Sequence, residues 1–294
     1  MKPIVNIEGL TKTYGKRRGI SGITFAIEEG EVFGFIGPNG AGKSTTIRTL
    51  LNIIFPTSGS ASIFGKDVVT QSLDIRRQIG YLPSEVFYYD DMKVVDLLRF
   101  AAAFHRCRNE KRIADLAGRL DLDLNRKIED LSFGNRKKVG IAQALLHEPK
   151  LLILDEPTGG LDPLMQNTFF ELLKEERAKG TTIFFSSHIL SEVQRMCDRV
   201  AIIKDGSLIK VESVENLMRN NLRHITLTAR QPDEIDLSAI AGIVRRERIG
   251  TTHLKLLYDG DMKAFVQGIA GCPFTDILIE EPSLDEIFLH YYTN

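Results

Sequence analysis

Cysteine is scarce in this sequence, and the cysteines that are present form no pattern. The three of them, Cys107, Cys197 and Cys272, lie far apart, and no two are arranged as C-x-x-C. Neither a disulfide framework nor a zinc site is therefore expected. A reducing cytoplasm is the natural setting for a chain of this kind.

Long hydrophobic runs are also missing. No apolar stretch approaches the ~20 residues that are needed to span a bilayer. Glu8 interrupts the beginning of the chain early, so no secretory signal peptide is expected. If the protein acts at a membrane, we expect it to do so through another chain.

Neither sign of charge is in excess, and no repeat or low-complexity tract is present. With 38 Lys and Arg against 39 Asp and Glu, the formal net charge is −1. A protein that binds nucleic acid normally carries a basic patch or stripe, so the composition gives no reason to expect a nucleic-acid partner. The length of 294 residues is enough for about two domains.

Residues 37–44, with the sequence GPNGAGKS, form the most informative stretch of the chain. They match the phosphate-binding template G-x-x-x-x-G-K-S/T at every fixed position. An apolar segment typical of a strand, Glu31–Ile36, precedes them, and Thr45–Ile54 follows with the apolar spacing of a helix. A strand, a glycine-rich loop and a helix N-terminus together surround the phosphates of a nucleotide. The alternative is a glycine-rich turn that fits the template by chance.

Each residue type in this loop has a chemical use. The glycines let successive backbone N–H groups point at an anion, the lysine reaches the β- and γ-phosphates of a triphosphate, and the hydroxyl ligates Mg²⁺. Ser44 is therefore also a predicted magnesium ligand. The predicted nucleotide-binding residues of the loop are Gly37, Asn39, Gly40, Ala41, Gly42, Lys43, Ser44 and Thr45.

Two carboxylates follow a second apolar run. Leu151–Leu154 has the continuous hydrophobicity of a strand that is buried on both faces, and Asp155 and Glu156 come directly after it. Beside a phosphate loop, Asp155 is expected to hold Mg²⁺, and Glu156 to orient or deprotonate an attacking water. The alternative is a solvated acidic turn after a core strand.

The rest of the pattern predicts an α/β fold with a helical insertion and a smaller appendix. Helical periodicity predicts the insertion over about residues 86–147. Turns are expected at Leu10–Gly15 and Ser58–Ser60. After Glu212 the chain changes to short strands mixed with helices, so we expect one domain over residues 1–211 and a second, α+β domain over residues 212–294.

Six motifs occur in an order that is typical of one family. Along residues 1–210 they are Tyr14, the phosphate loop, Leu131–Asn135 with the sequence LSFGN, Leu151–Glu156, Leu161 with Asp162, and His188. On these motifs the chain resembles the ATP-binding subunit of ABC (ATP-binding cassette) transporters. The resemblance implies a P-loop NTPase (RecA-like) core with an antiparallel β subdomain and a helical insertion, and it implies ATP and Mg²⁺ as ligands.

The same resemblance implies a role for each of the other motifs. It implies that Tyr14 stacks on adenine and that His188 hydrogen-bonds the γ-phosphate and aligns water with Glu156. It implies that a helix opened by Ser132, Gly134 and Asn135 caps the γ-phosphate bound to another subunit. It also implies that Leu161 and Asp162 communicate across the dimer. Taken alone, the same residues would be an ordinary turn aromatic, a serine-capped helix start and a structural histidine.

The chain departs from the family pattern at two places. Ser84, followed by Glu85, stands where the family usually has a glutamine that senses Mg²⁺ and the membrane partner. Serine is too short for the same reach, which calls direct metal contact at Ser84 into question. Phe133 replaces the usual first glycine of the signature, and Asn135 replaces its glutamine. Because Lys43, Asp155, Glu156 and His188 are present, we expect a working ATPase.

The resemblance also implies partners. A second cassette subunit, identical or paralogous, completes the site, and an integral membrane permease holds the protein at the inner face of the cell membrane. Glu281–Leu289 resembles the tail of bacterial exporter-type cassettes whose membrane subunits are separate chains. Val86–Tyr89 is expected to form a docking groove for a helix of the permease; the alternative is local packing of the insertion.

Two other functions stay open at this point. The first is a soluble cassette ATPase that acts on ribosomes or DNA, although such relatives usually have two cassettes in one chain or a long coiled-coil insertion. The second is a regulatory module that binds nucleotide without turnover, which the altered signature and Ser84 would favour.

Overall fold

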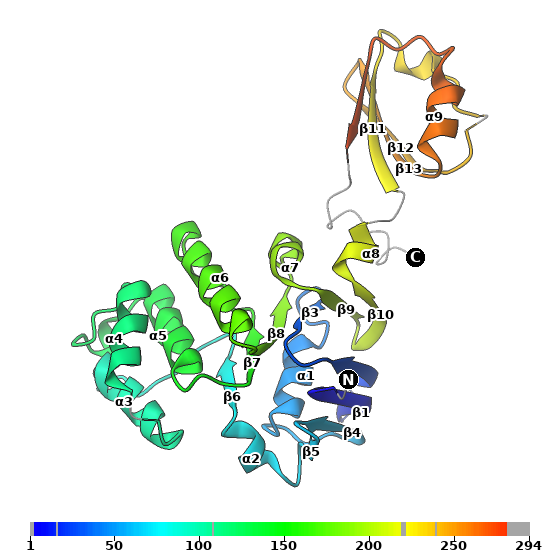
Figure 1. Ribbon diagram of the computed structural model, residues 1–294. Coiled ribbons are helices and arrows are strands. Elements are labelled where there is room, and N and C mark those ends of the chain that lie inside the picture. The colour runs from blue at the N-terminus through cyan, green and yellow to red at the C-terminus, as the bar shows by residue number, and fades with distance from the viewer. Residues whose placement is uncertain (1–2, 16, 108, 219–221, 239, 281–294) are drawn as a thin grey trace. The chain divides into compact units, whose positions relative to one another are not determined.

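The structure is a computed structural model that describes residues 3–15, 17–107, 109–218, 222–238 and 240–280. The chain divides into two compact units, Met1–Val214 and Glu215–Asn294 (Figure 1). The division lies close to the expected boundary between residues 211 and 212.

Six strands form the central sheet of the first unit, in the order β10-β9-β3-β8-β7-β6. Neighbouring strands from β9 to β6 run parallel, and β10 pairs antiparallel with β9 at one edge. All residues of β3, β7 and β8 are buried, which explains their nearly continuous apolar sequences. The bounds are Val32–Ile36 for β3, Ile79–Leu82 for β6, Leu151–Asp155 for β7, Thr182–Ser187 for β8, Arg199–Lys204 for β9 and Ser207–Ser213 for β10.

The carboxyl ends of the parallel strands bring three distant segments to one edge of this sheet. Ile36 at the end of β3 pairs with Ser187 of β8, and Asp155 at the end of β7 pairs with Ser186. The phosphate loop, the two carboxylates and His188 therefore all leave the sheet at the same edge. Ligands of open α/β sheets bind at this edge.

A second sheet of the first unit is antiparallel, with the order β2-β1-β4-β5. Its strands are β1 (Val5–Tyr14), β2 (Arg17–Ile27), β4 (Ser58–Ile63) and β5 (Lys66–Asp67). The turns predicted at Leu10–Gly15 and Ser58–Ser60 are wrong, because most of the first segment and all of the second lie in strands. Gly9 and Gly59 have positive φ, and a Cβ on Gly59 would lie 2.2 Å from the Gly9 carbonyl oxygen, so these glycines serve a close approach of two strands.

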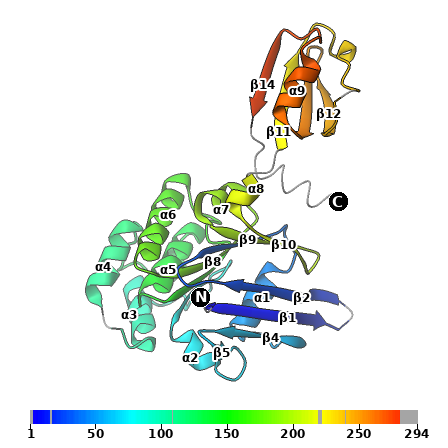
Figure 2. The ribbon, with the colours of Figure 1, turned by 45° about the vertical axis from the view of Figure 1, so that its right-hand side comes forward.

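Helix α1 (Lys43–Leu50) lies between the two sheets and contacts β2 and β7 (Figures 1 and 2). The sheets share one hydrophobic core with this helix. Within it, the ring of Phe25 from β2 stacks on that of Phe33 from β3, with 5.1 Å between the centroids. This core fixes the end of β3 and the beginning of α1, and thereby the position of the loop that joins them.

The opposite face of the central sheet is covered by α6 (Pro163–Ala178) and α7 (Leu190–Met196). The ring of Phe170 in α6 lies 6.4 Å from that of Phe185 in β8. Phe184 belongs instead to the core around α1, as expected for neighbouring residues of a strand.

Three helices lie together beside the sheets in Figure 1, within the predicted insertion of residues 86–147. They are α3 (Val94–Phe104), α4 (Glu110–Arg119) and α5 (Phe133–Leu145), and they contact one another. A short helix α2 (Ser72–Arg76) and a 3₁₀ turn at Ile128–Asp130 complete the helical parts of this unit.

The second unit has its own four-stranded antiparallel sheet, with the order β12-β13-β11-β14. The helix α9 and the sheet enclose a separate hydrophobic core that includes Phe265, Tyr258 and Leu256. The elements are α8 (Val214–Met218), β11 (Leu222–Thr228), a 3₁₀ turn (Pro232–Glu234), β12 (Ile243–Ile249), β13 (His253–Asp259), α9 (Met262–Ile269) and β14 (Asp276–Glu280). The segment Glu281–Leu289, to which the exporter-type tail was assigned, lies outside the described residues.

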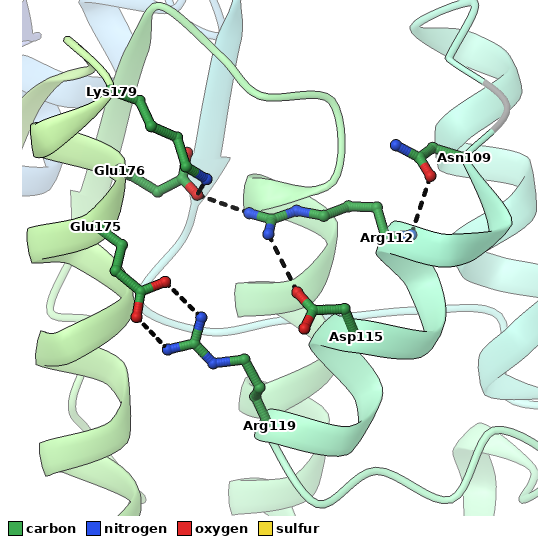
Figure 3. A network of polar contacts seen from close by, with 7 residues as sticks. All are labelled: Asn109, Arg112, Asp115, Arg119, Glu175, Glu176 and Lys179. Carbon is green, nitrogen blue, oxygen red and sulfur yellow. Dashed lines mark hydrogen bonds and ion pairs between the residues drawn. The ribbon is translucent and has the colours of Figure 1, made fainter.

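Salt bridges join the helical insertion to α6 (Figure 3). Arg112 of α4 donates to Oε1 of Glu176 at 2.6 Å, and only 1% of the Glu176 side chain is exposed. About two turns further along α4, Arg119 contacts both carboxylate oxygens of the more exposed Glu175, at 2.6 and 2.7 Å. The first pair is buried and the second is not, so losing each pair should lower the free energy of unfolding by a different amount.

We expect Glu176→Ala to lower the free energy of unfolding by about 3 kcal/mol, because it removes the buried carboxylate that pairs with Arg112 and leaves only the half-exposed Asp115 to that guanidinium. The matched control is Glu175→Ala on the same helix, which removes a half-exposed partner and should cost about 1 kcal/mol or less. Urea unfolding followed by circular dichroism compares the two variants. Equal losses would contradict the assignment of the buried pair as the main link.

Candidate functional site

The phosphate loop has a backbone that only glycine accommodates at several positions. Gly40 and Gly42 have φ of 80° and 110°, in the left-handed region. A Cβ on Gly37 would lie 2.4 Å from the carbonyl oxygen of Ile203. Gly42 caps α1 with no side-chain hydrogen bond, so backbone N–H groups at this helix N-terminus are left for an anion.

The ammonium group of Lys43 is folded back over this loop. Its side chain is only 4% exposed, and Nζ donates to the carbonyl oxygens of Gly37 at 2.6 Å and Pro38 at 3.2 Å. The same Nζ lies 3.2 Å from Oε1 of Glu156. The lysine thus connects the loop after β3 with the carboxylate after β7.

Asp155 is buried at the end of β7, and its two carboxylate oxygens differ. Oδ1 accepts a hydrogen bond from the Ser186 hydroxyl at 2.6 Å. Oδ2 has no hydrogen-bond partner among the described residues. A buried carboxylate oxygen normally has a partner, and a hard divalent cation prefers such an oxygen together with a hydroxyl such as that of Ser44. The residues present therefore fit Mg²⁺.

Glu156 lies between two basic side chains. In addition to Lys43, Nδ1 of His188 lies 3.4 Å from Glu156 Oε1. The backbone of Glu156 has a positive φ of 46°, and its N–H donates to the carbonyl and the hydroxyl oxygen of Ser186. Glu156 and His188, predicted from positions 32 residues apart in the sequence, are thus in contact in the structure.

A cleft with a volume of about 390 Å³, within the usual range for ligand sites, opens over the loop. Tyr14 lines it with a half-exposed ring, although it lies far from the loop in sequence. Of the predicted loop residues, Gly37 and Ala41 are absent from its lining. The residues that line the cleft are Tyr14, Gly19, Asn39, Gly40, Gly42, Lys43, Ser44, Thr45, Ser84, Glu85 and Glu156.

The signature residues line a different pocket. Ser132, Gly134, Asn135, Leu161 and Asp162 all border it, together with Phe133, Lys138 and Gly160. It shares no lining residue with the cleft over the phosphate loop. The structure therefore does not bring these predicted nucleotide contacts to the cleft of their own chain.

Within one chain, Ser132 and Asp162 each cap a helix. The Ser132 hydroxyl accepts from the backbone N–H of Asn135 at 3.3 Å at the start of α5, and the Asp162 carboxylate accepts from that of Met165 at 2.9 Å at the start of α6. The two helix starts meet closely, since a Cβ on Gly134 would lie 2.5 Å from the Gly160 carbonyl oxygen. The residues expected to form the signature and those expected to communicate across the dimer therefore lie side by side in one local structure.

Two residues that contact this site were not predicted. Ser186 holds Asp155 and the Glu156 backbone, and it occupies the sequence position just before Ser187 and His188. Gly19 lines the cleft beside Tyr14, where a Cβ would lie 2.3 Å from the Lys12 carbonyl oxygen. An isolated glycine between Arg18 and Ile20 gives no sequence signal for such a position.

The four residues expected to form a docking groove separate into two pairs. Val86 is buried, and the Tyr88 hydroxyl packs near Gly140 of α5, whereas Phe87 and Tyr89 are 82% and 67% exposed. The interpretation of the whole run as a groove is therefore wrong, because alternate residues face the interior. Phe87 and Tyr89 stay candidates for contact with another chain.

In the part of the chain that the structure describes, no helix has the length and apolar character needed to cross a membrane.

Comparisons with known proteins agree on one family. The family model described as "ABC transporter" matches residues 20–159. The bacitracin transport ATP-binding protein BcrA of Bacillus licheniformis is 36% identical over 76% of this chain and 74% of its own length. The linearmycin resistance ATP-binding protein LnrL of Bacillus subtilis is 30% identical over 98% of this chain and 97% of its own.

A solved structure supports the same conclusion. It is a dimeric ATP-binding cassette in a post-hydrolysis state, bound to ADP and phosphate. It superposes with a TM-score of 0.67 at 25% identity, covering 71% of this chain and 98% of that one. The predicted fold, a P-loop NTPase core with an antiparallel subdomain and a helical insertion, is confirmed.

We expect Asp155→Asn to lower the apparent affinity for Mg²⁺ in the presence of ATP by at least about tenfold, because a neutral amide replaces the carboxylate. Titration with a fluorescent ATP analogue at increasing Mg²⁺ concentration measures this effect. Ser186→Ala keeps the carboxylate and removes the hydroxyl's bonds to Oδ1 and to the Glu156 N–H, which still has the Ser186 carbonyl as acceptor, so it should weaken magnesium binding less than Asp155→Asn does. An unchanged dependence in Asp155→Asn would rule out this carboxylate as a ligand.

Proposed function

The chain belongs to the ATP-binding subunits of ABC transporters and is an ATPase, and we propose that it drives an exporter whose membrane permease is a separate polypeptide. The observation that carries this proposal is that Lys43 and Glu156 meet in the cleft over the phosphate loop and that His188 contacts the same Glu156 carboxylate. The protein would be bound to the inner face of the cell membrane through that permease.

The proposed outward direction is supported by the relatives' names. One refers to bacitracin transport and another to linearmycin resistance. Removal of a compound from the cell accounts for both transport and resistance. Export of a compound of this kind is therefore the working hypothesis for this chain.

Nucleotide binding is assigned to the cleft residues. Tyr14 stacks on adenine, the backbone N–H groups after Gly40 surround the phosphates, and Lys43 binds the β- and γ-phosphates. Ser44 and Asp155 are the residues that would hold Mg²⁺, which neutralises phosphate charge when bound. Ser84 lines the cleft but is too short for a direct metal contact of the kind a glutamine makes.

Hydrolysis is assigned to Glu156 and His188. The Glu156 carboxylate accepts a proton from the attacking water, and His188, whose Nδ1 lies 3.4 Å from it, aligns that water and hydrogen-bonds the γ-phosphate. When Lys43 binds phosphate oxygens, its positive charge interacts with the nucleotide as well as with Glu156, so its ion pair with Glu156 weakens. The carboxylate is then freer to act on water.

A second cassette is required to complete this site. The pocket at Ser132 and Gly134 lies apart from the cleft of the same chain, and the N-terminus of α5 offers a positive dipole end to an anion. We infer that it caps the γ-phosphate held by a partner copy, identical or paralogous. Leu161 and Asp162 border the same pocket and would pass the nucleotide state between the two chains.

The two units have separate proposed tasks. Residues 1–211 form the ATPase cassette, and the α+β domain of residues 212–294 supports the dimer or regulates it. Of the alternatives, a soluble ribosome- or DNA-associated cassette is not favoured, because the insertion consists of short helices, α3 to α5, and has no long coiled coil among the described residues.

We expect Glu156→Gln to reduce steady-state phosphate release by at least about a hundredfold, because the amide cannot accept a proton from water. The same variant should accumulate as a dimer with ATP, which light scattering detects. Lys43→Met is the control, since it should lose nucleotide binding and stay monomeric. A Glu156→Gln protein that binds Mg-ATP and never dimerises would refute the composite site.

We expect the double variant Phe87→Ala with Tyr89→Ala to lose the stimulation of ATPase activity by the permease in the assembled transporter, while the isolated chain keeps its basal turnover. The reason is that these rings are exposed and lie next to the Ser84 wall of the cleft in sequence. Ile249→Ala, an exposed apolar change in β12, is the matched control. Normal stimulation in the double variant would exclude these rings from the docking surface.

A further inference from the structure

Lys137 is a buried lysine that the mechanism above does not use. It lies in the second turn of α5, and its side chain is fully buried. Its Nζ donates to the carbonyl oxygens of Pro83 and Ser84, both at 2.9 Å. An ammonium group inside a protein is costly unless hydrogen bonds replace its water, and here two backbone carbonyls do so.

Keeping the ammonium group of Lys137 charged carries a desolvation cost. Burial lowers the pKa of Lys137 to about 8, and the negative charges of Asp155 and Glu156 oppose that shift. An apolar side chain of similar volume could fill the same space without desolvating a charge. The lysine is therefore better explained by the connection it makes than by packing alone.

The connection joins the two separate pockets. Ser84 lines the cleft over the phosphate loop, and Ser132 at the start of α5 lines the signature pocket. Lys137 follows Ser132 by five residues on one continuous helix, a distance of about 7.5 Å along its axis. A helix turn is stiff, so a displacement of the Ser84 segment is transmitted to the signature end of α5.

We propose that Lys137 is a positioning residue that links the cleft wall at Ser84 to the signature helix, so that nucleotide in the cleft sets the orientation of Ser132 toward the partner subunit. Both hydrogen bonds go to backbone carbonyls, so the link does not depend on the side chain at position 84. It operates in a chain where that position holds serine in place of the usual glutamine. The inference rests on the proposed ATP-driven dimer.

The test separates nucleotide binding from dimerisation. In a Glu156→Gln parent, Lys137→Met keeps the length of the side chain and removes its donors. Because Lys137 does not line the cleft, ATP affinity should stay within about twofold of the parent. The dissociation constant of the ATP-bound dimer, measured by sedimentation, should rise at least about tenfold, the scale for losing hydrogen bonds to a charged group. Lys174→Met, an exposed lysine in α6, should change neither quantity.

The outcomes distinguish this inference from the proposed function. If the Glu156→Gln parent itself does not dimerise, the proposed function fails. If the parent dimerises and Lys137→Met dimerises equally well, Lys137 is not a link and the inference is overturned. A loss of ATP affinity in parallel with dimerisation would also overturn it, because a general structural defect lowers both.

A measurement on the unmodified chain covers the case in which Lys137→Met does not fold. At a concentration that keeps the protein monomeric, hydrogen exchange is followed with and without Mg-ATP. The link predicts that ATP changes exchange both at the amides of Ser84 and Glu85 and in the first turn of α5. A change confined to Ser84 and Glu85 would overturn it.

Discussion

The ion pair between Lys43 and Glu156 is the contact on which the rest of the site depends. It joins the loop after β3 to the carboxylate after β7, although β8 lies between these strands in the sheet. The parallel arrangement makes this possible, because it brings the carboxyl ends of all three strands to one edge. Ser186 at the end of β8 completes the connection through its hydrogen bond to Asp155. The residues proposed for nucleotide binding, metal ligation and water activation are thereby placed at one edge of the sheet.

The division of the motifs between two pockets is the reason for proposing that a partner chain completes the site. The cleft contains a lysine, hydroxyls and carboxylates but no group from α5, while the signature pocket offers a helix start and no phosphate loop. Neither half surrounds a triphosphate. If the two pockets act together, the chain must also communicate between them, and Lys137 and the close approach of Gly134 to Gly160 are the contacts that we propose for this. The salt bridges of α4 with α6 hold the helical insertion that carries α5 (Figure 3).

Much of this arrangement could be predicted from the sequence, for identifiable reasons. The phosphate loop and Asp155 follow fully buried strands, whose unbroken apolar runs are easy to recognise. The turns expected at Leu10–Gly15 and Ser58–Ser60 were wrong because glycine and polar residues are typical of turns, whereas here Thr11 to Tyr14 pair with a neighbouring strand and Gly59 lies where two strands pass too closely for a side chain. Lys137 could not have been found, since its burial depends on loop carbonyls more than 50 residues away in sequence. Whether Phe87 or Tyr88 points toward the interior likewise depends on how α5 packs.

The central claim is that each active site is built from two chains, and a mixing experiment tests it most directly. One chain carries Lys43→Met and keeps its signature; the other carries Ser132→Asp, which preserves the cap of α5 but places a negative charge against the partner's phosphate. Each variant alone should release almost no phosphate. Their mixture forms dimers with one intact composite site, and the account predicts that phosphate release reappears on mixing. Activity no higher than the sum of the separate variants, with both folded and the Ser132→Asp chain still binding ATP, would contradict it.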